Sequence, residues 1–165
     1  MKRVVSLVCF GLTLLGCLIA TPAANAGEIA PAAHQKLVSK SVEYLDDGSM
    51  LVTAVYEVVN NSRINTLNKS GSKKYTRTDS NGEILWTFTV SGEFLIIDGV
   101  SVTCTSATCS ANILESTWSC TRQFAERSGS QAVAEGTFIL KLLGITVKEE
   151  NVDIALSCDV YGNLS

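Results

Sequence analysis

The feature that most constrains this fold is a two-residue alternation of apolar and polar side chains, which dominates the chain after position 40. Between Val152 and Val160, for example, every second residue is apolar or cysteine. This period is typical of a β-strand with one buried face. Turn sequences separate such segments, and their Asp-Gly and Asn-Gly steps favour tight hairpin turns; the clearest are Asp46-Asp47-Gly48-Ser49 and Asp79-Ser80-Asn81-Gly82.

The spacing of these segments predicts an all-β domain. Hairpins are expected between residues 42–44 and 50–59, between 73–78 and 83–90, and between 108–113 and 117–124. We expect a loop over residues 60–71 and a break in the strand at Ser91-Gly92. The segment 131–143 has some helix-favouring composition, but Gly136 and the step Thr137-Phe138-Ile139 favour a strand. Without a strand–helix–strand rhythm, the pattern predicts an antiparallel β-sandwich or barrel stapled by disulfides.

The first 26 residues have the pattern of a secretory signal peptide. Two basic residues precede an apolar run, Val4 to Ala20, and a small-x-small site follows at Ala24-Asn25-Ala26. Cleavage there leaves 139 of the 165 residues, starting at Gly27, with no transmembrane segment. We therefore expect a signal peptide over 1–26, a flexible lead-in over 27–39 and one β domain over 40–165, located outside the cell.

A lipid anchor is the alternative to this cleavage. Leu14-Leu15-Gly16-Cys17 resembles the lipobox of bacterial lipoproteins, in which the cysteine is lipidated and becomes the N-terminus. However, the apolar run continues past Cys17 to Ala20, whereas a polar tether usually follows a lipidated cysteine. The ordinary signal peptide is the favoured interpretation, and anchoring through Cys17 stays open.

Four cysteines remain after signal cleavage, and an even number in an exported chain suggests two disulfides. Their separations do not suit a four-cysteine zinc site, which needs closer pairs. Of the three possible pairings, one is favoured because Cys109 and Cys120 lie symmetrically about Leu114-Glu115, the centre of an expected hairpin. Cys104 would then pair with Cys158, joining the last strand to the middle of the domain.

Charge is unevenly distributed along the chain. Signal cleavage removes two of the 13 basic residues and none of the 16 acidic ones, so the net charge falls from −3 to −5, which argues against general nucleic-acid binding. Between Glu57 and Asp79 no acidic residue occurs, yet the segment has five basic ones. These five are Arg63, Lys69, Lys73, Lys74 and Arg77. They form a candidate anion-binding face for a cell-wall polymer, anionic lipid or acidic glycan. Alternatively, they belong to a solvated loop and to an edge strand that its lysines protect from aggregation.

The sequence offers little support for catalysis. Its single histidine, His34, falls in the expected lead-in, where it is poorly placed to act as a general base. Trp86 and Trp118 could form a sugar-binding platform, but their places on alternating strands favour the core. No metal or cofactor site is indicated. Carboxylates that could pair for glycoside hydrolysis look like ordinary turn and surface residues: Glu93, Asp98, Asp153 and Asp159.

Several short turn and core sequences between residues 69 and 165 form a recognisable set. They are Lys69-Ser70-Gly71-Ser72-Lys73, Asp79-Ser80-Asn81-Gly82, Leu85-Trp86-Thr87-Phe88-Thr89-Val90, Cys104-Thr105, Gly136-Thr137-Phe138, Leu143-Gly144-Ile145, Ser157-Cys158-Asp159 and the terminal Gly162-Asn163-Leu164-Ser165. With these stretches the segment resembles a family of small secreted bacterial proteins of unknown function. The resemblance implies an exported bacterial β protein and carries no catalytic residue.

Three classes of function are compatible with this sequence. The leading hypothesis is a non-enzymatic extracellular module that binds a cell-envelope component or another macromolecule. A small secreted effector, either an inhibitor or an antimicrobial protein, comes second. A carboxylate-dependent hydrolase is the weakest, because an enzyme needs converging titratable groups in a cleft.

Overall fold

The computed structural model describes residues 34–59 and 67–165, and this part of the chain consists of strands and turns without a helix. The prediction of an all-β domain is therefore confirmed. Eight antiparallel strands follow one another along the chain: β1 (Gln35–Tyr44), β2 (Met50–Val58), β3 (Leu67–Thr78), β4 (Ile84–Ile97), β5 (Ser101–Ile113), β6 (Trp118–Ser128), β7 (Gln131–Leu142) and β8 (Ile145–Ser157).

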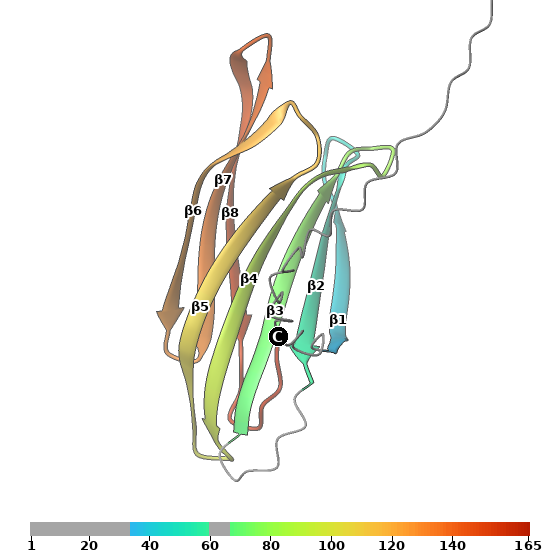
Figure 1. Cartoon of the computed structure of the whole chain (residues 1–165). Helices are drawn as coiled ribbons and strands as arrows, with labels where there is room; N and C mark the ends of the chain where they lie inside the picture. The colour runs from blue at the N-terminus through green and yellow to red at the C-terminus, as the bar shows by residue number, and fades with distance from the viewer. Residues whose placement is uncertain (1–33, 60–66) are drawn as a thin grey trace, which may run out of the picture. The chain divides into compact units, whose positions relative to one another are not determined.

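The strands form two sheets, one of five strands in the order β1-β2-β3-β4-β5 and one of three in the order β6-β7-β8 (Figure 1). Every neighbour in a sheet is also a neighbour in sequence, so each sheet is a simple antiparallel meander. Tight turns make this possible. At the β1–β2 turn, for instance, the Gly48 amide donates to the Leu45 carbonyl at 2.9 Å, and Gly48 has the positive φ, 77°, that the sequence predicts.

The hydrophobic core lies between the two sheets, because the inward faces of both supply buried side chains. The alternation predicted for the fourth strand is confirmed, because Trp86, Phe88 and Val90 of β4 are at most 1% exposed. That predicted for 152–160 is confirmed as far as Ser157, where β8 ends: Ile154 and Leu156 are equally buried, whereas Val160 lies in a turn. The strand predicted for 131–143 is also confirmed as β7. Its Ala132, Ala134 and Phe138 complete the centre of the core.

The predicted break at Gly92 is wrong, because β4 continues through it to Ile97. Gly92 instead allows the two sheets to approach closely. A methyl group at its Cα would lie only 2.8 Å from the Cβ of Ala132 in β7. The residue therefore has a packing role within a strand, and it does not act as a turn.

The predicted hairpin around Leu114-Glu115 is also wrong. β5 pairs with β4 and β6 pairs with β7, so among the described strands the chain changes sheet between β5 and β6. The amides of Leu114 and Glu115 both donate to the carbonyl of Leu85, each at 3.0 Å, and so tie this connection to the start of β4. Because the connection is held there, the chain leaves the five-stranded sheet and β6 does not pair with β5.

The strands at the start of the domain extend further than predicted. β1 begins at Gln35, inside the range 27–39 expected to be a lead-in, and Gln35 pairs with Val58. β3 begins at Leu67, inside the expected loop 60–71. Apart from the described His34, the other residues of these two ranges are 27–33 and 60–66, and they lie outside the described part of the chain. The predicted signal peptide and Cys17 also lie outside it.

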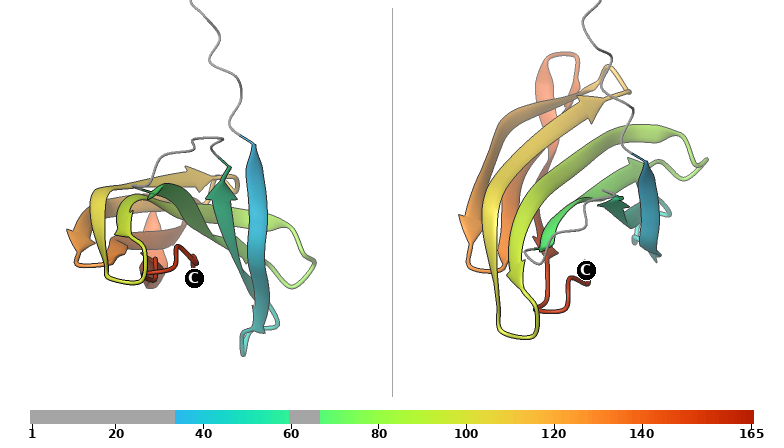
Figure 2. Two further views of the ribbon diagram at one scale, coloured as in Figure 1. Left: turned by 90° about the horizontal axis from the view of Figure 1, so that it is seen from below. Right: turned by 60° about the horizontal axis from the view of Figure 1, so that its bottom comes forward.

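The C-terminal residues after β8 fold back onto the concave side of the five-stranded sheet (Figure 2). Ser157 and Ser165 exchange two backbone hydrogen bonds, of 2.9 and 3.0 Å. The side chain of Leu164 is thereby buried over Gly71 of β3, where a Cβ atom would lie 2.4 Å from Leu164 Cδ1. The tail is thus an integral part of the inner packing.

Candidate functional site

The structure does not gather the predicted basic residues on one face. Lys69 is held by an ion pair with Glu57, with 2.5 Å between Nζ and Oε1. Lys73 lies opposite Val55 and Val90, which are core residues, whereas its neighbour Lys74 lies on the other side of the sheet. Arg63 falls outside the described residues.

Arg77, the last of the predicted basic residues, is buried at 2% exposure in an ion cluster. Its Nη2 lies 3.1 Å from Asp47 Oδ2 and 3.1 Å from Glu150 Oε1. Its Nη1 donates to the hydroxyl of Ser49 and to the carbonyl of Thr78. These contacts join the β1–β2 turn, β3 and β8. Arg77 therefore acts as a structural residue whose donors are already used.

Lys148 completes this cluster and balances its charge. Its Nζ lies 2.8 Å from Glu150 Oε1 and 3.1 Å from Asp47 Oδ2. The hydrogen bond to Glu150 is the main reason that the pKa of Lys148 is raised. The pKa of Asp47 is lowered, first by hydrogen bonds from the Ser49 side chain and amide, then by Lys148. With two acids and two bases, the cluster leaves no net charge to attract an ionic ligand.

These pKa shifts predict how stability depends on pH. Because the pKa of folded Asp47 lies below its ordinary value, its contribution is present above about pH 4 and is lost as acid protonates the folded carboxylate. Because the pKa of Lys148 is raised, its contribution is lost only as alkali deprotonates it. We expect Asp47→Asn to unfold at lower urea than the wild type at pH 7, and the difference to shrink towards pH 2. Asp46→Asn is the matched control and should follow the wild type throughout.

The outer face of the five-stranded sheet, which points away from the core, has a polar groove. It consists of two adjoining hollows with volumes of about 260 and 360 Å³ that share Gln35, Ser72 and Ser91. Tyr56 of β2 lines the second hollow. The groove extends from Gln35 at the start of β1 across β2, β3 and β4 to β5, so side chains far apart in sequence meet along it.

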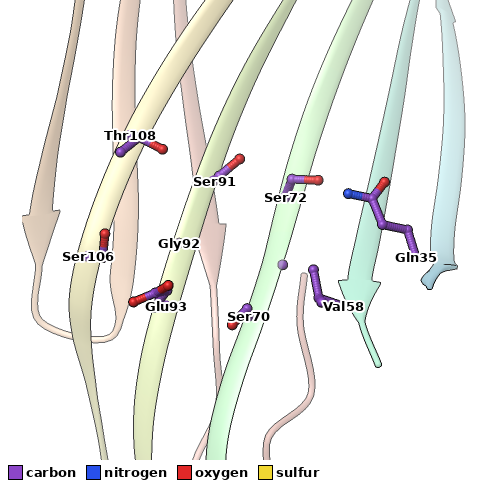
Figure 3. Close-up of a pocket in the computed structure, with 10 residues that line it drawn as sticks. Gln35, Val58, Ser70, Ser72, Ser91, Gly92, Glu93, Ser106 and Thr108 are labelled. Atoms are coloured by element: carbon purple, nitrogen blue, oxygen red, sulfur yellow. The ribbon is translucent and has the colours of Figure 1, made fainter. Parts of the chain in front are cut away.

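Strand register arranges hydroxyl groups across this groove in rows. Ser72 of β3 lies opposite Ser91 of β4, which lies opposite Thr108 of β5. Figure 3 shows the three side chains crossing the sheet in line, with Gln35 pointing towards Ser72. Since opposite Cα atoms in an antiparallel ladder are about 4.5–5.5 Å apart, the hydroxyls repeat at a short, regular spacing.

A charged residue stands on either side of this central row. In the next row Glu93 lies between Ser70 and Ser106 (Figure 3). On the other side, Lys74 lies opposite Thr89. Of the predicted basic residues that the structure describes, Lys74 is the one that lines the groove. The site therefore offers hydroxyls, an amide, one cation and one anion.

The hydroxyls of the central row have no partner within the described part of the chain, and the row runs from Ser72, which is only 9% exposed, to Thr108, which is exposed to solvent. No hydrogen bond between described residues engages the side chains of Ser72, Ser91 or Thr108, although many other serines and threonines in the described ranges are bonded, as Thr105 is to the Glu93 carbonyl at 3.1 Å. A hydroxyl both donates and accepts. The row can therefore bind a partner that has donors and acceptors in alternation.

Sequence reasoning missed this groove. The signal was present as alternate Ser and Thr residues opposite the buried face, at 87, 89 and 91 and again at 106, 108 and 110. What was missing is the register that aligns these strands, which the sequence does not specify. The other predicted candidates take ordinary places: both tryptophans lie in the core as predicted, at 1% and 6% exposure, and His34 is exposed.

The carboxylates considered for hydrolysis lie on separate elements. Glu93 is in the groove, Asp98 is in the β4–β5 turn and Asp153 is on β8. Asp159 is occupied by the C-terminal turn, where it accepts from the amides of Tyr161 and Asn163 at 2.9 and 2.8 Å. Among the residues that the structure describes, no group of three metal-ligating side chains occurs.

The four cysteines of the domain are free thiols in the structure, so the predicted disulfides are not formed in it. The Cys104 amide donates to the Gly129 carbonyl at 2.8 Å, and the Cys158 amide donates to the carbonyl of the next residue, Ser130, at 3.0 Å. Burial, and the charge of Asp159 beside it, raise the pKa of the Cys158 thiol to about 11, with a smaller contribution from Cys104.

Cys109 and Cys120 show the same proximity. Burial raises the pKa of the Cys109 thiol, and the neighbouring Cys120 raises it further. The two residues face the core from β5 and β6, one in each sheet. Each pair that the sequence predicts as a disulfide thus includes a thiol whose pKa the other raises, even though the hairpin used to argue for one of the pairs does not form.

Comparison of the chain with models of protein families, with curated proteins and with solved structures finds no match. The resemblance to small secreted bacterial proteins therefore stays a prediction. In the described ranges, the structure also contains no helix long and apolar enough to cross a membrane.

Proposed function

We propose that this chain is a non-enzymatic extracellular module that binds a glycan strand of the cell envelope along the outer face of β2–β5. The observation that carries this proposal is the row of free hydroxyls formed by Ser72, Ser91 and Thr108, with Gln35 beside it and Tyr56 along the groove. The four carboxylates considered for hydrolysis lie apart, and two others that do converge, Asp47 and Glu150, are neutralised by Arg77 and Lys148, which favours binding over hydrolysis.

A polysaccharide suits the chemistry of this groove. Sugar hydroxyls alternate donors and acceptors as serine and threonine do, and the face of a tyrosine ring packs against the apolar side of a sugar ring. Each hydrogen bond contributes only about 0.5–1.5 kcal/mol net, so we expect moderate affinity built from many contacts. Lys74 and Glu93 can select for a carboxylate or an amine on the sugar chain.

We further propose that the domain is a β-sandwich secreted after cleavage before Gly27 and stapled by Cys104–Cys158 and Cys109–Cys120. The shared core between two sheets supports the sandwich, and the proximity of each thiol pair supports the staples. Each bridge forms one S–S bond and releases two protons and two electrons, which a protein disulfide of the extracytoplasmic oxidising machinery accepts.

Co-sedimentation with purified bacterial peptidoglycan sacculi tests the binding function. We expect the exported protein to sediment with sacculi and the double variant Ser91→Ala/Thr108→Val to bind about tenfold more weakly, because two hydroxyl contacts are lost. The matched control is Thr103→Val, an exposed threonine of β5 on the same face but outside the groove. Equal binding by the double variant and the wild type, or no binding by the wild type, would contradict the proposal.

A further inference from the structure

The turn between β7 and β8 exposes an unusual group of apolar side chains. Leu142, Leu143, Ile145 and Val147 are 51%, 103%, 68% and 53% exposed. Figure 1 shows this hairpin extending beyond the ends of the strands beside it. Single exposed apolar residues are normal on a protein surface, but a contiguous group at a projecting tip marks an interaction site.

Leu143 also has an unfavourable backbone conformation. It has a positive φ of 51°, followed by Gly144 with a φ of 81°, in a two-residue turn between the paired residues Leu142 and Ile145. Turns of this type favour Asn or Gly at the first position, because a branched side chain in the left-handed region is strained. The fold gains nothing from a leucine here, which points to a role outside folding.

The charges around the tip indicate which partner fits. From Leu142 to Val147 no charged residue occurs, and the first on either side is a lysine. Lys141 is exposed, whereas Lys148 is engaged with Asp47 and Glu150. An apolar tip with a free cation at its base complements a layer of anionic phospholipid headgroups above hydrocarbon.

The dimensions of the tip agree with this partner. Two residue steps separate the Lys141–Thr146 pair from the turn, which corresponds to about 7 Å at 3.3–3.4 Å per residue. Apolar elements that lie in a membrane interface are buried by about 5–10 Å. Leu142, Leu143 and Ile145 would reach the acyl boundary while Lys141 stays among the headgroups.

We propose that the β7–β8 tip, Leu142 to Val147, docks the protein on an anionic phospholipid membrane by inserting its apolar side chains into the interface. This site is separate from the glycan groove and does not depend on it. The two together would place the protein between the membrane surface and an envelope polymer.

Leu143→Asn separates this role from folding, because asparagine adopts a positive φ more readily than leucine. With vesicles of phosphatidylglycerol and phosphatidylcholine, we expect the exported wild-type protein to co-float and Leu143→Asn to partition about tenfold more weakly. Its melting temperature should equal or exceed that of the wild type. Lys141→Gln should weaken partitioning about fivefold.

Val100→Asn is the matched control, because Val100 is 73% exposed in the β4–β5 turn, at the other end of the strands (Figure 1). This variant should partition like the wild type. All variants share the same N-terminal segment, so that segment cannot cause a difference between them. The proposal is overturned if Leu143→Asn floats as well as the wild type. It is also overturned if the wild type ignores vesicles and instead forms a dimer that Leu143→Asn abolishes.

Discussion

Replacing Phe138 with alanine is expected to lower the free energy of unfolding by about 3–5 kcal/mol, the usual cost of removing a fully buried phenylalanine. Phe138 is 0% exposed and lies at the centre of the core. Its ring stacks on Trp86 with centroids 4.0 Å apart and meets Phe88 edge to face at 5.6 Å. The substitution removes both aromatic contacts and leaves a cavity between the two sheets.

Urea unfolding followed by tryptophan fluorescence measures this loss directly, because Trp86 is the stacked partner. Phe124→Ala on β6 is the matched control: its ring is 49% exposed, so the expected loss is within about 1 kcal/mol. If the two substitutions cost the same, the core does not lie where the structure places it.

The second large effect is expected for the double variant Cys104→Ser/Cys158→Ser. A Cys104–Cys158 bridge would close a long loop from β5 to the end of β8, and on the loop-entropy model such a bridge contributes about 4 kcal/mol. This is a large share of the roughly 5–15 kcal/mol that stabilises an ordinary domain. We expect the exported variant to unfold at clearly lower urea than the exported wild type.

A reducing agent provides the control for this experiment. It should destabilise the exported wild type by at least as much as the double substitution and should affect the variant less, since only Cys109 and Cys120 remain to be reduced. Peptide mapping without reduction identifies the bridges. A fragment that joins Cys104 to Cys109, or four free thiols in the exported protein, would contradict the proposed pairing.

Much of this fold could be predicted from the sequence because one buried face per strand leaves a period of two. The alternation from Val152 to Cys158 and the turns at Gly48 and Gly82 are local signals, and they led to the correct strands. Gly92 shows the limit of such reasoning. A glycine within an alternating segment signals either a break or a close approach, and the neighbour that decides, Ala132, lies forty positions away.

The connection between β5 and β6 shows a second limit. Locally, residues 108–124 look like a hairpin, but the anchoring of Leu114 and Glu115 to Leu85 sends the two strands into different sheets. The groove could not be predicted for a related reason. Its hydroxyls align only when β3, β4 and β5 take their observed register, and the four described basic residues of the segment between Glu57 and Asp79 are divided between two faces and an ion cluster.

The central claim, that the outer face binds a glycan, is tested most directly by NMR titration of the exported protein with a soluble peptidoglycan fragment. Amide resonances of Ser72, Ser91 and Thr108 should shift together and saturate at one fragment concentration, while those of the β7–β8 tip stay in place. Resonance shifts that are confined to the inner face or to the tip would contradict the account. So would the absence of any shift at concentrations where the protein binds sacculi.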